Sequence, residues 1–236
     1  MKHEKKPFVS IIIPVHNESL RLRGVLSHVS EMFGSDAEII IVDASPESSV
    51  LKENLSVKYI HSNKAIRSCQ MNLGAEKSEA QMLLFLHADT ILPESARDKL
   101  MNISEGDGQY YGAFYKKFDS NNLFLKVIAF VNNLQLQYQA KFLGDNTFFA
   151  SRELFNRIGG FPEISLMEDV ELSHILQKEK KRSQVRCVVI KNKVITSARK
   201  FTRNGILKTF LLMQKIRLLY FFGVSPEKLR KMYYSR

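Results

Sequence analysis

Polar residues that could bind a ligand follow three apolar segments in the first part of this chain. The apolar segments are 8–15 (FVSIIIPV), 38–45 (EIIIVDAS) and 82–87 (MLLFLH). The polar residues at or just after their ends are His16, Asn17, Glu18, Asp43, His87 and Asp89. If these segments are parallel strands, their carboxyl ends meet at one edge of a sheet, where open α/β sheets bind ligands. One polar strand ending is unremarkable because loops are polar, but three that coincide predict a nucleotide-type pocket.

The pattern around these residues predicts the elements that would hold them. The β-branched run 8–15 is typical of a parallel strand buried on both faces. Apolar residues at helical spacing follow it as far as Gly34. Further elements are expected as strands at 38–45, 56–62 and 82–87 and as a helix at 64–77. This alternation predicts a doubly wound α/β sheet with right-handed crossovers.

The second half of the chain predicts more strands and helices. We expect strands at 108–118, 147–151 and 184–197 (the last a strand or a hairpin) and helices at 123–144, 168–181 and 205–223. No internal repeat or linker interrupts the pattern, and 236 residues fit one domain.

The charge balance predicts an anionic partner. Lys and Arg number 35 against 24 Asp and Glu, a formal net charge of +11. Nucleic acid, an acidic membrane surface and a phosphorylated small molecule all fit this charge.

Two distant cysteines, Cys69 and Cys187, form neither a disulfide framework nor a metal cluster, which favours a reducing cytosol. Pro14 interrupts the first apolar run, so this run predicts a core strand rather than a targeting segment, and no stretch is long enough to span a membrane.

Five motifs resemble, in order and spacing, family 2 glycosyltransferases with a GT-A fold. They are VSIIIPVHNE, EIIIVDAS, LLFLHADT, GDNTFFASRELFNRIGGFPE and MEDVELS, within residues 8–182. The resemblance is greatest to a small bacterial subgroup that shares HADT, GDN, LMEDVEL and TSAR and carries a label linking it to arsenosugar biosynthesis. It implies a Rossmann-like, mostly parallel mixed sheet with helices on both faces and a C-terminal helical segment. The implied single domain, 1–236, has a nucleotide-binding half (8–104), an acceptor-binding half (105–200) and C-terminal helices (201–236).

The resemblance also implies a nucleotide-diphosphate sugar donor and a divalent metal, Mn²⁺ or Mg²⁺. A hard cation held by carboxylate neutralises the diphosphate as it leaves. Asp89 stands where the family places its principal metal ligand, and His87 replaces the first acid of the usual Asp-x-Asp pair. Imidazole suits Mn²⁺ better than Mg²⁺, and the sequence leaves open whether His87 contacts the metal or the diphosphate.

By the same resemblance, a set of residues around the strand ends binds the nucleotide. These residues are Pro14, His16, Asn17, Glu18, Asp43, Arg67, His87 and Ala88. Helix capping is the alternative role for Asn17 and Asp43. Arg199 and Arg203 are expected to grip the diphosphate oxygens, or else to lie in a solvated basic loop. Phe201 stands near them where the subgroup has an aromatic residue, in a chain without tryptophan.

The pair Glu168-Asp169 is expected to provide the catalytic base. An inverting transfer needs one carboxylate to take the proton of the acceptor hydroxyl. The family uses the Asp of this pair, here Asp169, and Glu168 positions it or contacts the acceptor. Acids also favour a helix N-terminus for its dipole alone. The residues Gly144, Asp145 and Asn146 are expected near the acceptor, with a plain turn as an equal alternative.

The helix expected at 205–223 fits two roles. It is either core, or an interfacial helix that rests on anionic lipid through cationic residues, with 123–143 adding to that surface. The second role would suit a lipid-linked acceptor and a location at the inner face of the membrane rather than free in the cytoplasm.

Other functions remain as alternatives. A sugar nucleotidyltransferase is disfavoured because the loop PVHNE has no glycine. A non-catalytic basic nucleotide- or nucleic-acid-binding α/β protein is supported by charge alone, and no nucleic-acid motif appears. A catalytically dead relative is disfavoured by Asp89 and Asp169.

Overall fold

The computed structural model describes residues 6–46, 57–143 and 145–234. Within these residues, eight strands form one sheet in the order β3-β2-β1-β4-β7-β6-β8-β5. The strands are β1 (Val9–Val15), β2 (Ala37–Asp43), β3 (Val57–His61), β4 (Met82–Phe85), β5 (Thr90–Ile91), β6 (Tyr110–Phe118), β7 (Phe148–Ser151) and β8 (Arg186–Thr196).

The sheet is mixed and mostly parallel, as predicted. Strands β1, β2, β3 and β4 run parallel to one another, and β8 runs parallel to β6. Strand β7 is antiparallel to both β4 and β6, and the short β5 is antiparallel to β8. The carboxyl ends of β1, β2 and β4 therefore meet at one edge of the sheet, where the polar residues were expected.

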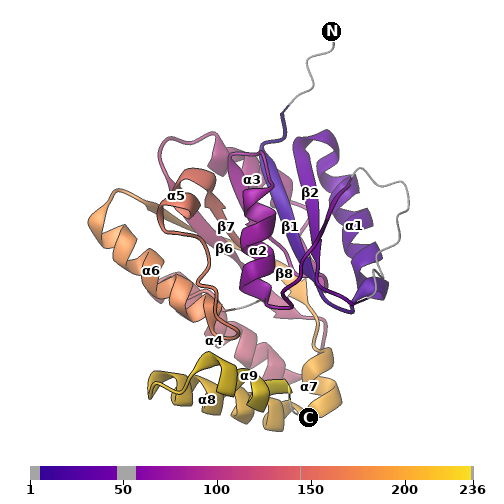
Figure 1. Ribbon diagram of the computed structural model, residues 1–236, viewed down its shortest axis with the longest axis vertical. Coiled ribbons are helices and arrows are strands. Elements are labelled where there is room, and N and C mark those ends of the chain that lie inside the picture. The colour runs from indigo at the N-terminus through magenta and orange to yellow at the C-terminus, as the bar shows by residue number, and fades with distance from the viewer. Residues whose placement is uncertain (1–5, 47–56, 144, 235–236) are drawn as a thin grey trace.

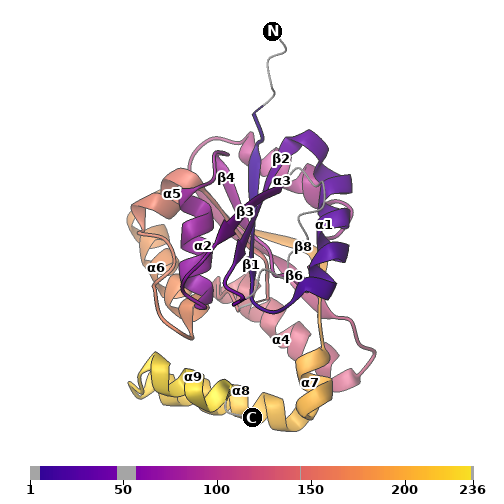
Figure 2. The same ribbon diagram turned by 45° about the vertical axis from the view of Figure 1, so that its right-hand side comes forward.

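Helices cover both faces of the sheet and form a further layer at one end (Figures 1 and 2). They are α1 (Ser19–Phe33), α2 (Arg67–Glu76), α3 (Ala96–Ser104), α4 (Leu123–Gln139), α5 (Arg152–Arg157), α6 (Glu168–Arg182), α7 (Arg199–Asn204), α8 (Ile206–Phe221) and α9 (Pro226–Tyr234), with a 3₁₀ turn at Gly34–Asp36. Figures 1 and 2 show α7, α8 and α9 beside α4, at the end of the molecule away from α3.

Alternate residues of β1 enter different cores because successive strand side chains point to opposite faces. Ile11 and Ile13 pack with the apolar side of α1 and with α3. Ile12 packs on the other face, in a cluster that includes residues of α2, α5 and α6. This division is what a doubly wound sheet requires, and it explains why the strand is apolar at consecutive positions.

Several elements differ from the expected ranges. The predicted strand 82–87 ends at Phe85, and His87, Ala88 and Asp89 lie in the turn between β4 and β5, closed by a hydrogen bond from Thr90 N to His87 O of 3.1 Å. The predicted helix 123–144 ends at Gln139, where Ala140 adopts a left-handed conformation. The helix that Asp43 would cap in its alternative role falls at residues 47–56, outside the described residues.

Gly112 is needed where β6 passes closest to β8. A Cβ added there would lie 1.9 Å from the carbonyl oxygen of Val188 and 2.5 Å from the ring of Phe149. We expect Gly112→Ala to lower the free energy of unfolding by about 1–3 kcal/mol or more, because the core must shift to admit a methyl group. Urea denaturation measures the change.

Gly24→Ala is the matched control. Gly24 lies inside α1, and a Cβ there meets no atom within 4 Å. Alanine should therefore stabilise the protein by roughly 0.5–1 kcal/mol through helix propensity. An unchanged urea midpoint for Gly112→Ala would show that β6 and β8 do not pack in this register.

Candidate active site

The loop after β1 is held in one conformation by the end of β2. The backbone of Asn17 has φ = 56°, a left-handed geometry that asparagine tolerates better than most residues. Asn17 N donates to Ser45 Oγ at 2.8 Å, and His16 Nδ1 lies 3.0 Å from Ala44 O in a hydrogen bond. These contacts present His16 and Asn17 at the surface, at the carboxyl edge of the sheet.

Asp43 is fully buried and anchors that arrangement. Its Oδ1 accepts hydrogen bonds from the backbone N and the hydroxyl of Ser45, at 2.8 and 2.6 Å. Its Oδ2 accepts a hydrogen bond from the Tyr59 hydroxyl at 2.9 Å. Both carboxylate oxygens are thus engaged by the protein, so Asp43 acts on the loop through Ser45 and Asn17. Pro14 lies half-buried in β1 opposite Val42.

Gln70, which was not predicted as a site residue, links the ends of β1 and β2. Its Nε2 donates to Val15 O at 2.8 Å and to Val42 O at 2.7 Å. A buried amide that satisfies two carbonyls fixes the spacing of β1 and β2 where their loops begin. The signal for it was a polar residue on the buried side of the 64–77 helix.

Two carboxylates lie close together beyond β1 and β4. The pKa of Glu18 is raised above its usual value, first by burial and then by the charge of Asp89, while Arg199, Arg21 and Arg67 act in the opposite direction. Arg21 Nη1 is 4.0 Å from Asp89 Oδ2, and Arg199 Nη2 is 3.6 Å from Glu18 Oε1. The structure therefore brings together side chains from the β1 loop, the β4–β5 turn, α1, α2 and α7.

The Glu18 and Asp89 carboxylates fit a divalent cation whose remaining ligands are oxygens of a diphosphate. The Asp89 carboxylate disfavours the charged form of Glu18, and a cation beside them would relieve that repulsion. Among the described residues no group of three or more His, Cys, Asp or Glu side chains forms a metal site. One or two carboxylates plus substrate phosphates is nevertheless the usual mode for Mg²⁺. Ala88, between His87 and Asp89, is buried.

Arg67 joins this group to the acids at the start of α6. Its Nε lies 3.2 Å from Oε1 of the buried Glu168. Burial lowers the pKa of Arg67, but Glu168, Tyr234, Asp169 and Tyr233 outweigh it and raise that pKa above its usual value. The pKa of Glu168 is raised, chiefly by burial and also by Asp169, against the opposite effect of Arg67. Arg67 is thus firmly cationic.

Asp145 is a third acidic position, and it pairs with a lysine that was not predicted as a site residue. Lys116 Nζ lies 3.3 Å from Asp145 Oδ2, and the Lys116 side chain is 3% exposed. Burial raises the pKa of Asp145, but the charges of Lys116, His87 and Arg67 lower it below its usual value. His87 lines a cavity together with Asn146, the neighbour of Asp145. Alternation along the strand YYGAFYKKF directs one of its two adjacent lysines inward.

Asn146 has a structural role in the same loop. Its side-chain amide accepts from Leu143 N at 3.2 Å and donates to Phe114 O at 3.1 Å, so both groups serve the backbone. Its neighbour Gly144 lies outside the described residues.

Two adjoining cavities share Arg67, Glu168 and Asp169 in their walls. His87 and Asn146 line the first. The second has a volume of about 110 Å³, and Lys116, Asp145 and Tyr233 line its polar part. Its apolar wall consists of Phe118, Ile128, Leu143, Leu166, Met167, Val170, Phe201, Met213 and Ile216. Asp169 therefore faces the same space as Arg67, between a polar and an apolar region.

The C-terminal helices close over Arg67. Lys200 Nζ lies 3.0 Å from the centre of the Tyr233 ring, and burial together with the Arg67 charge lowers the pKa of Lys200 to about 8. Arg230 Nη2 donates to Ala65 O at 2.8 Å. Arg203 is exposed at the end of α7 and takes no part in the ion pairs that link the described site residues. Lys200 and Tyr233 were not predicted as site residues because their partners are distant in sequence.

A family model and several solved structures of glycosyltransferases are similar to this chain. A family model described as glycosyl transferase family 2 matches residues 10–159. A mannosyltransferase from Pyrobaculum calidifontis, solved with GDP-Man and Mn²⁺, is similar with a TM-score of 0.65 at 16% identity, covering 97% of this chain and 68% of that one. TarS 1–349 from S. aureus has a TM-score of 0.60 at 12% identity, covering 95% and 69%. The same TarS fragment in complex with UDP-GlcNAc has a TM-score of 0.60 at 14% identity, covering 80% and 58%. No curated protein sequence was found to match.

Proposed function

Because this chain belongs to glycosyl transferase family 2 and is a glycosyltransferase, we propose that it transfers a sugar from a nucleotide-diphosphate donor to an acceptor hydroxyl with inversion at the anomeric carbon. The observation that carries the proposal is the position of Arg67. Its charge acts on Glu18, which lies beside Asp89, and it forms an ion pair with Glu168, next to Asp169. One guanidinium group therefore acts both on a residue that we assign to the donor side and on one that we assign to the acceptor side.

The donor would lie along the carboxyl edge of β1, β2 and β4. The loop His16–Glu18, held through Ser45 by Asp43, is suited to the base and ribose. Arg67 and Arg199 are suited to the diphosphate, since guanidinium groups bind phosphate oxygens in a bidentate manner. Support comes from the similar structures solved with GDP-Man and with UDP-GlcNAc.

Asp89, with Glu18 beside it, would hold a divalent cation at this edge. When bound, such a cation neutralises the charge that develops on the departing diphosphate. The similar mannosyltransferase was solved with Mn²⁺, and an imidazole ligand, if His87 provides one, would favour that metal. The protein's own part is to hold the two carboxylates and the neighbouring arginines in place.

Asp169 is the proposed base. Glu168 is buried and engaged by Arg67, whereas Asp169 is half-buried in the wall of both cavities. A carboxylate in that position can accept the proton of an acceptor hydroxyl as the oxygen attacks. Glu168 then positions Arg67, and Asp145, paired with Lys116, lies where it could contact a sugar hydroxyl.

The second cavity indicates the chemistry of the acceptor. Its acidic end contains Asp169, and its far wall is formed by apolar side chains of α4, α7 and α8. An acceptor that carries an apolar group near its hydroxyl, such as a lipid-linked one, would fill both parts. Cys69 and Cys187 are free thiols, which supports a location of the protein in the cytosol. A lipid-linked acceptor would place it at the inner face of the membrane. The arsenosugar label of the resembling subgroup stays a prediction.

Thermal unfolding with UDP, GDP and CDP, each with and without Mn²⁺, tests the proposal. We expect one nucleotide to raise Tm by about 5–10 °C at a hundred times its Kd, and only when Mn²⁺ is present. Tight, steeply salt-dependent DNA binding with no nucleotide effect would instead favour a basic nucleic-acid-binding protein. Equal stabilisation with and without Mn²⁺ would contradict the metal-dependent mechanism.

A further inference from the structure

Helix α4 presents a wide apolar face to solvent. Its inward residues, such as Leu125, Ala129 and Leu136, are buried. The large exposed apolar residues recur at helical spacing on the opposite side, and they are Leu123, Phe124, Val127, Phe130, Val131, Leu134 and Tyr138. The Leu123 side chain is 75% exposed and that of Phe130 is 61% exposed. Exposed apolar residues gathered on one face are typical of an interaction surface.

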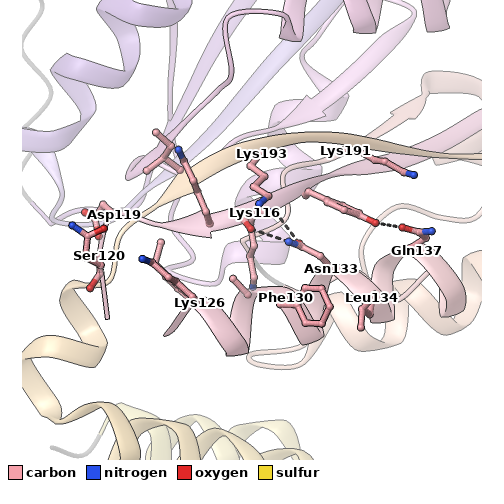
Figure 3. Close-up of a pocket in the computed structure, with 16 residues that line it drawn as sticks. Lys116, Asp119, Ser120, Lys126, Phe130, Asn133, Leu134, Gln137, Lys191 and Lys193 are labelled. Carbon is pink, nitrogen blue, oxygen red and sulfur yellow. Dashed lines mark hydrogen bonds between the residues drawn. The ribbon is translucent and has the colours of Figure 1, made fainter. Parts of the chain in front are cut away.

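A groove with lysines on its walls runs along one flank of this apolar face (Figure 3). It has a volume of about 1010 Å³ and lies between α4 and the strands β6 and β8. Exposed lysines from all three elements line it, and these are Lys117, Lys126, Lys191 and Lys193. Asp119 is the one acid among the described lining residues, and its Oδ1 accepts a hydrogen bond from Ala198 N at 2.6 Å. The groove is therefore strongly cationic.

The groove is a defined part of the fold rather than a loose surface. Strand β7 pairs with β6 only at Tyr111–Ala113, so the backbone of Lys116 lies beyond it. Asn133 of α4 satisfies that backbone instead: Lys116 N donates to Asn133 Oδ1 at 2.9 Å, and Asn133 Nδ2 donates to Lys116 O at 3.0 Å (Figure 3). These two bonds hold α4 at a fixed position against β6 and keep the groove open beside them.

Helix α8 adds a second apolar face next to the first. Phe124 of α4 packs edge-to-face on Phe210 of α8, with ring centres 5.4 Å apart. The exposed large apolar residues of α8 and its C-terminal end are Leu207, Leu211, Leu218, Phe221 and Phe222. In the described part of the chain, no helix is long and apolar enough to cross a membrane. A helix of this kind can still bind by lying in the interface plane.

We propose that α4 and α8 dock this protein on an anionic lipid bilayer. The apolar side chains of α4 enter the boundary between headgroups and acyl chains, and the groove lysines contact lipid phosphates. Charge complementarity supports this occupant, because the whole chain carries +11 and the groove concentrates lysines beside apolar residues. A second copy of the chain, placed symmetrically, would bring lysines against lysines. Nucleic acid would neutralise the lysines, but its phosphate backbone would not bury the exposed Leu and Val side chains.

The docking surface adjoins the candidate acceptor site. Lys116 and Phe118 line both the lysine groove and the cavity that contains Glu168 and Asp169. A molecule held in the bilayer would therefore approach Asp169 from the side of α4. This link to the acceptor rests on the proposed function, whereas docking itself is a property of the surface and can be measured without any sugar donor.

Vesicle sedimentation tests the docking. We expect binding to vesicles of phosphatidylcholine with phosphatidylglycerol, weakened by added salt, and little binding to phosphatidylcholine alone. Lys191→Gln with Lys193→Gln should weaken binding about thirtyfold, because each lysine near an anionic surface contributes to the attraction. Leu123→Ser with Phe130→Ser should weaken it by about tenfold or more through lost apolar burial. All four side chains are exposed, so the variants should fold normally.

The matched control is Lys6→Gln with Lys99→Gln. It removes two exposed positive charges, with Lys99 on α3 at the opposite end of the molecule from α4 (Figure 1), and should bind vesicles as the wild type does. Equal loss in this control, or equal wild-type binding to neutral and anionic vesicles, would overturn the proposal. The wild type could instead form dimers in light scattering and fail to bind vesicles. If Leu123→Ser with Phe130→Ser abolished those dimers, the surface would be an interface with a second copy of the chain, and the proposal would be wrong. Nucleotide-dependent stabilisation, measured on the same variants, reports separately on the proposed function.

Discussion

Asp169→Asn is expected to lower kcat by about 10²–10⁴-fold while leaving nucleotide affinity nearly unchanged. The amide has the shape of the carboxylate but cannot accept the proton of the acceptor hydroxyl, and general base catalysis contributes about that factor. Nucleotide binding should persist because the ion pair between Arg67 and Glu168 and the contact between Arg199 and Glu18 do not involve Asp169. Release of the nucleoside diphosphate measures turnover, and Mn²⁺-dependent thermal stabilisation measures binding.

Glu171→Gln is the control for this prediction. Glu171 is another acid in the first turn of α6, but it contacts the Tyr220 hydroxyl at 2.7 Å rather than the cavities. A glutamine there can keep that hydrogen bond, so both turnover and binding should stay close to the wild type. If Asp169→Asn retains full turnover, or if it loses nucleotide binding, Asp169 is not the base.

Asp89→Ala is expected to remove the Mn²⁺-dependent part of nucleotide binding. Loss of residues that only support a metal ligand already costs about 10–100-fold in metal affinity, and loss of a carboxylate ligand should cost about a hundredfold or more. Arg21, which lies 4.0 Å from Asp89, also donates to Ser197, so the loop should keep its structure. Titration of Mn²⁺ at fixed nucleotide concentration, followed by thermal unfolding, measures the apparent metal affinity.

Asp98→Ala provides the comparison for Asp89→Ala. Asp98 lies in the first turn of α3, its side chain is 76% exposed, and it forms an ion pair with Arg97 at 3.0 Å. Its loss removes one negative charge of the same kind without touching the strand ends. A normal Mn²⁺ response in Asp89→Ala, or an equal loss in both variants, would count against Asp89 as the ligand.

The fold could be predicted from the sequence because its first half is locally consistent. The β-branched runs and the helical spacing between them specify parallel strands and crossover helices, and the structure confirms this doubly wound sheet. The carboxyl ends of β1, β2 and β4 follow from that topology. The short β5 and the helix α3 were not predicted, and α5 and α9 were expected without bounds of their own, since their few residues carry no periodicity strong enough to be distinguished from loops.

The site was harder to predict because some residues matter only through distant partners. Strand alternation indicates that one of two adjacent lysines points inward, but nothing local identifies Asp145 as the partner of Lys116, or Tyr233 as the ring beneath Lys200. For Asp43 the position was predictable, but its hydrogen-bond partners were not. The sequence placed it correctly at a strand end, but only the structure shows that Ser45 and Tyr59 occupy both of its oxygens. The roles assigned to Asp89, Asp169 and Glu168 stay predictions for the experiments above.

The pairing of Arg67 with Glu168 has a consequence for the order of events in a catalytic cycle. In the proposed mechanism, a diphosphate that arrives beside Arg67 would compete with Glu168 for the same guanidinium, and burial raises the pKa of the Glu168 carboxyl. Donor binding and the protonation of Glu168 would then be thermodynamically linked, and the linkage would be reciprocal. On this proposal, the charges around Asp169 differ before and after the donor binds.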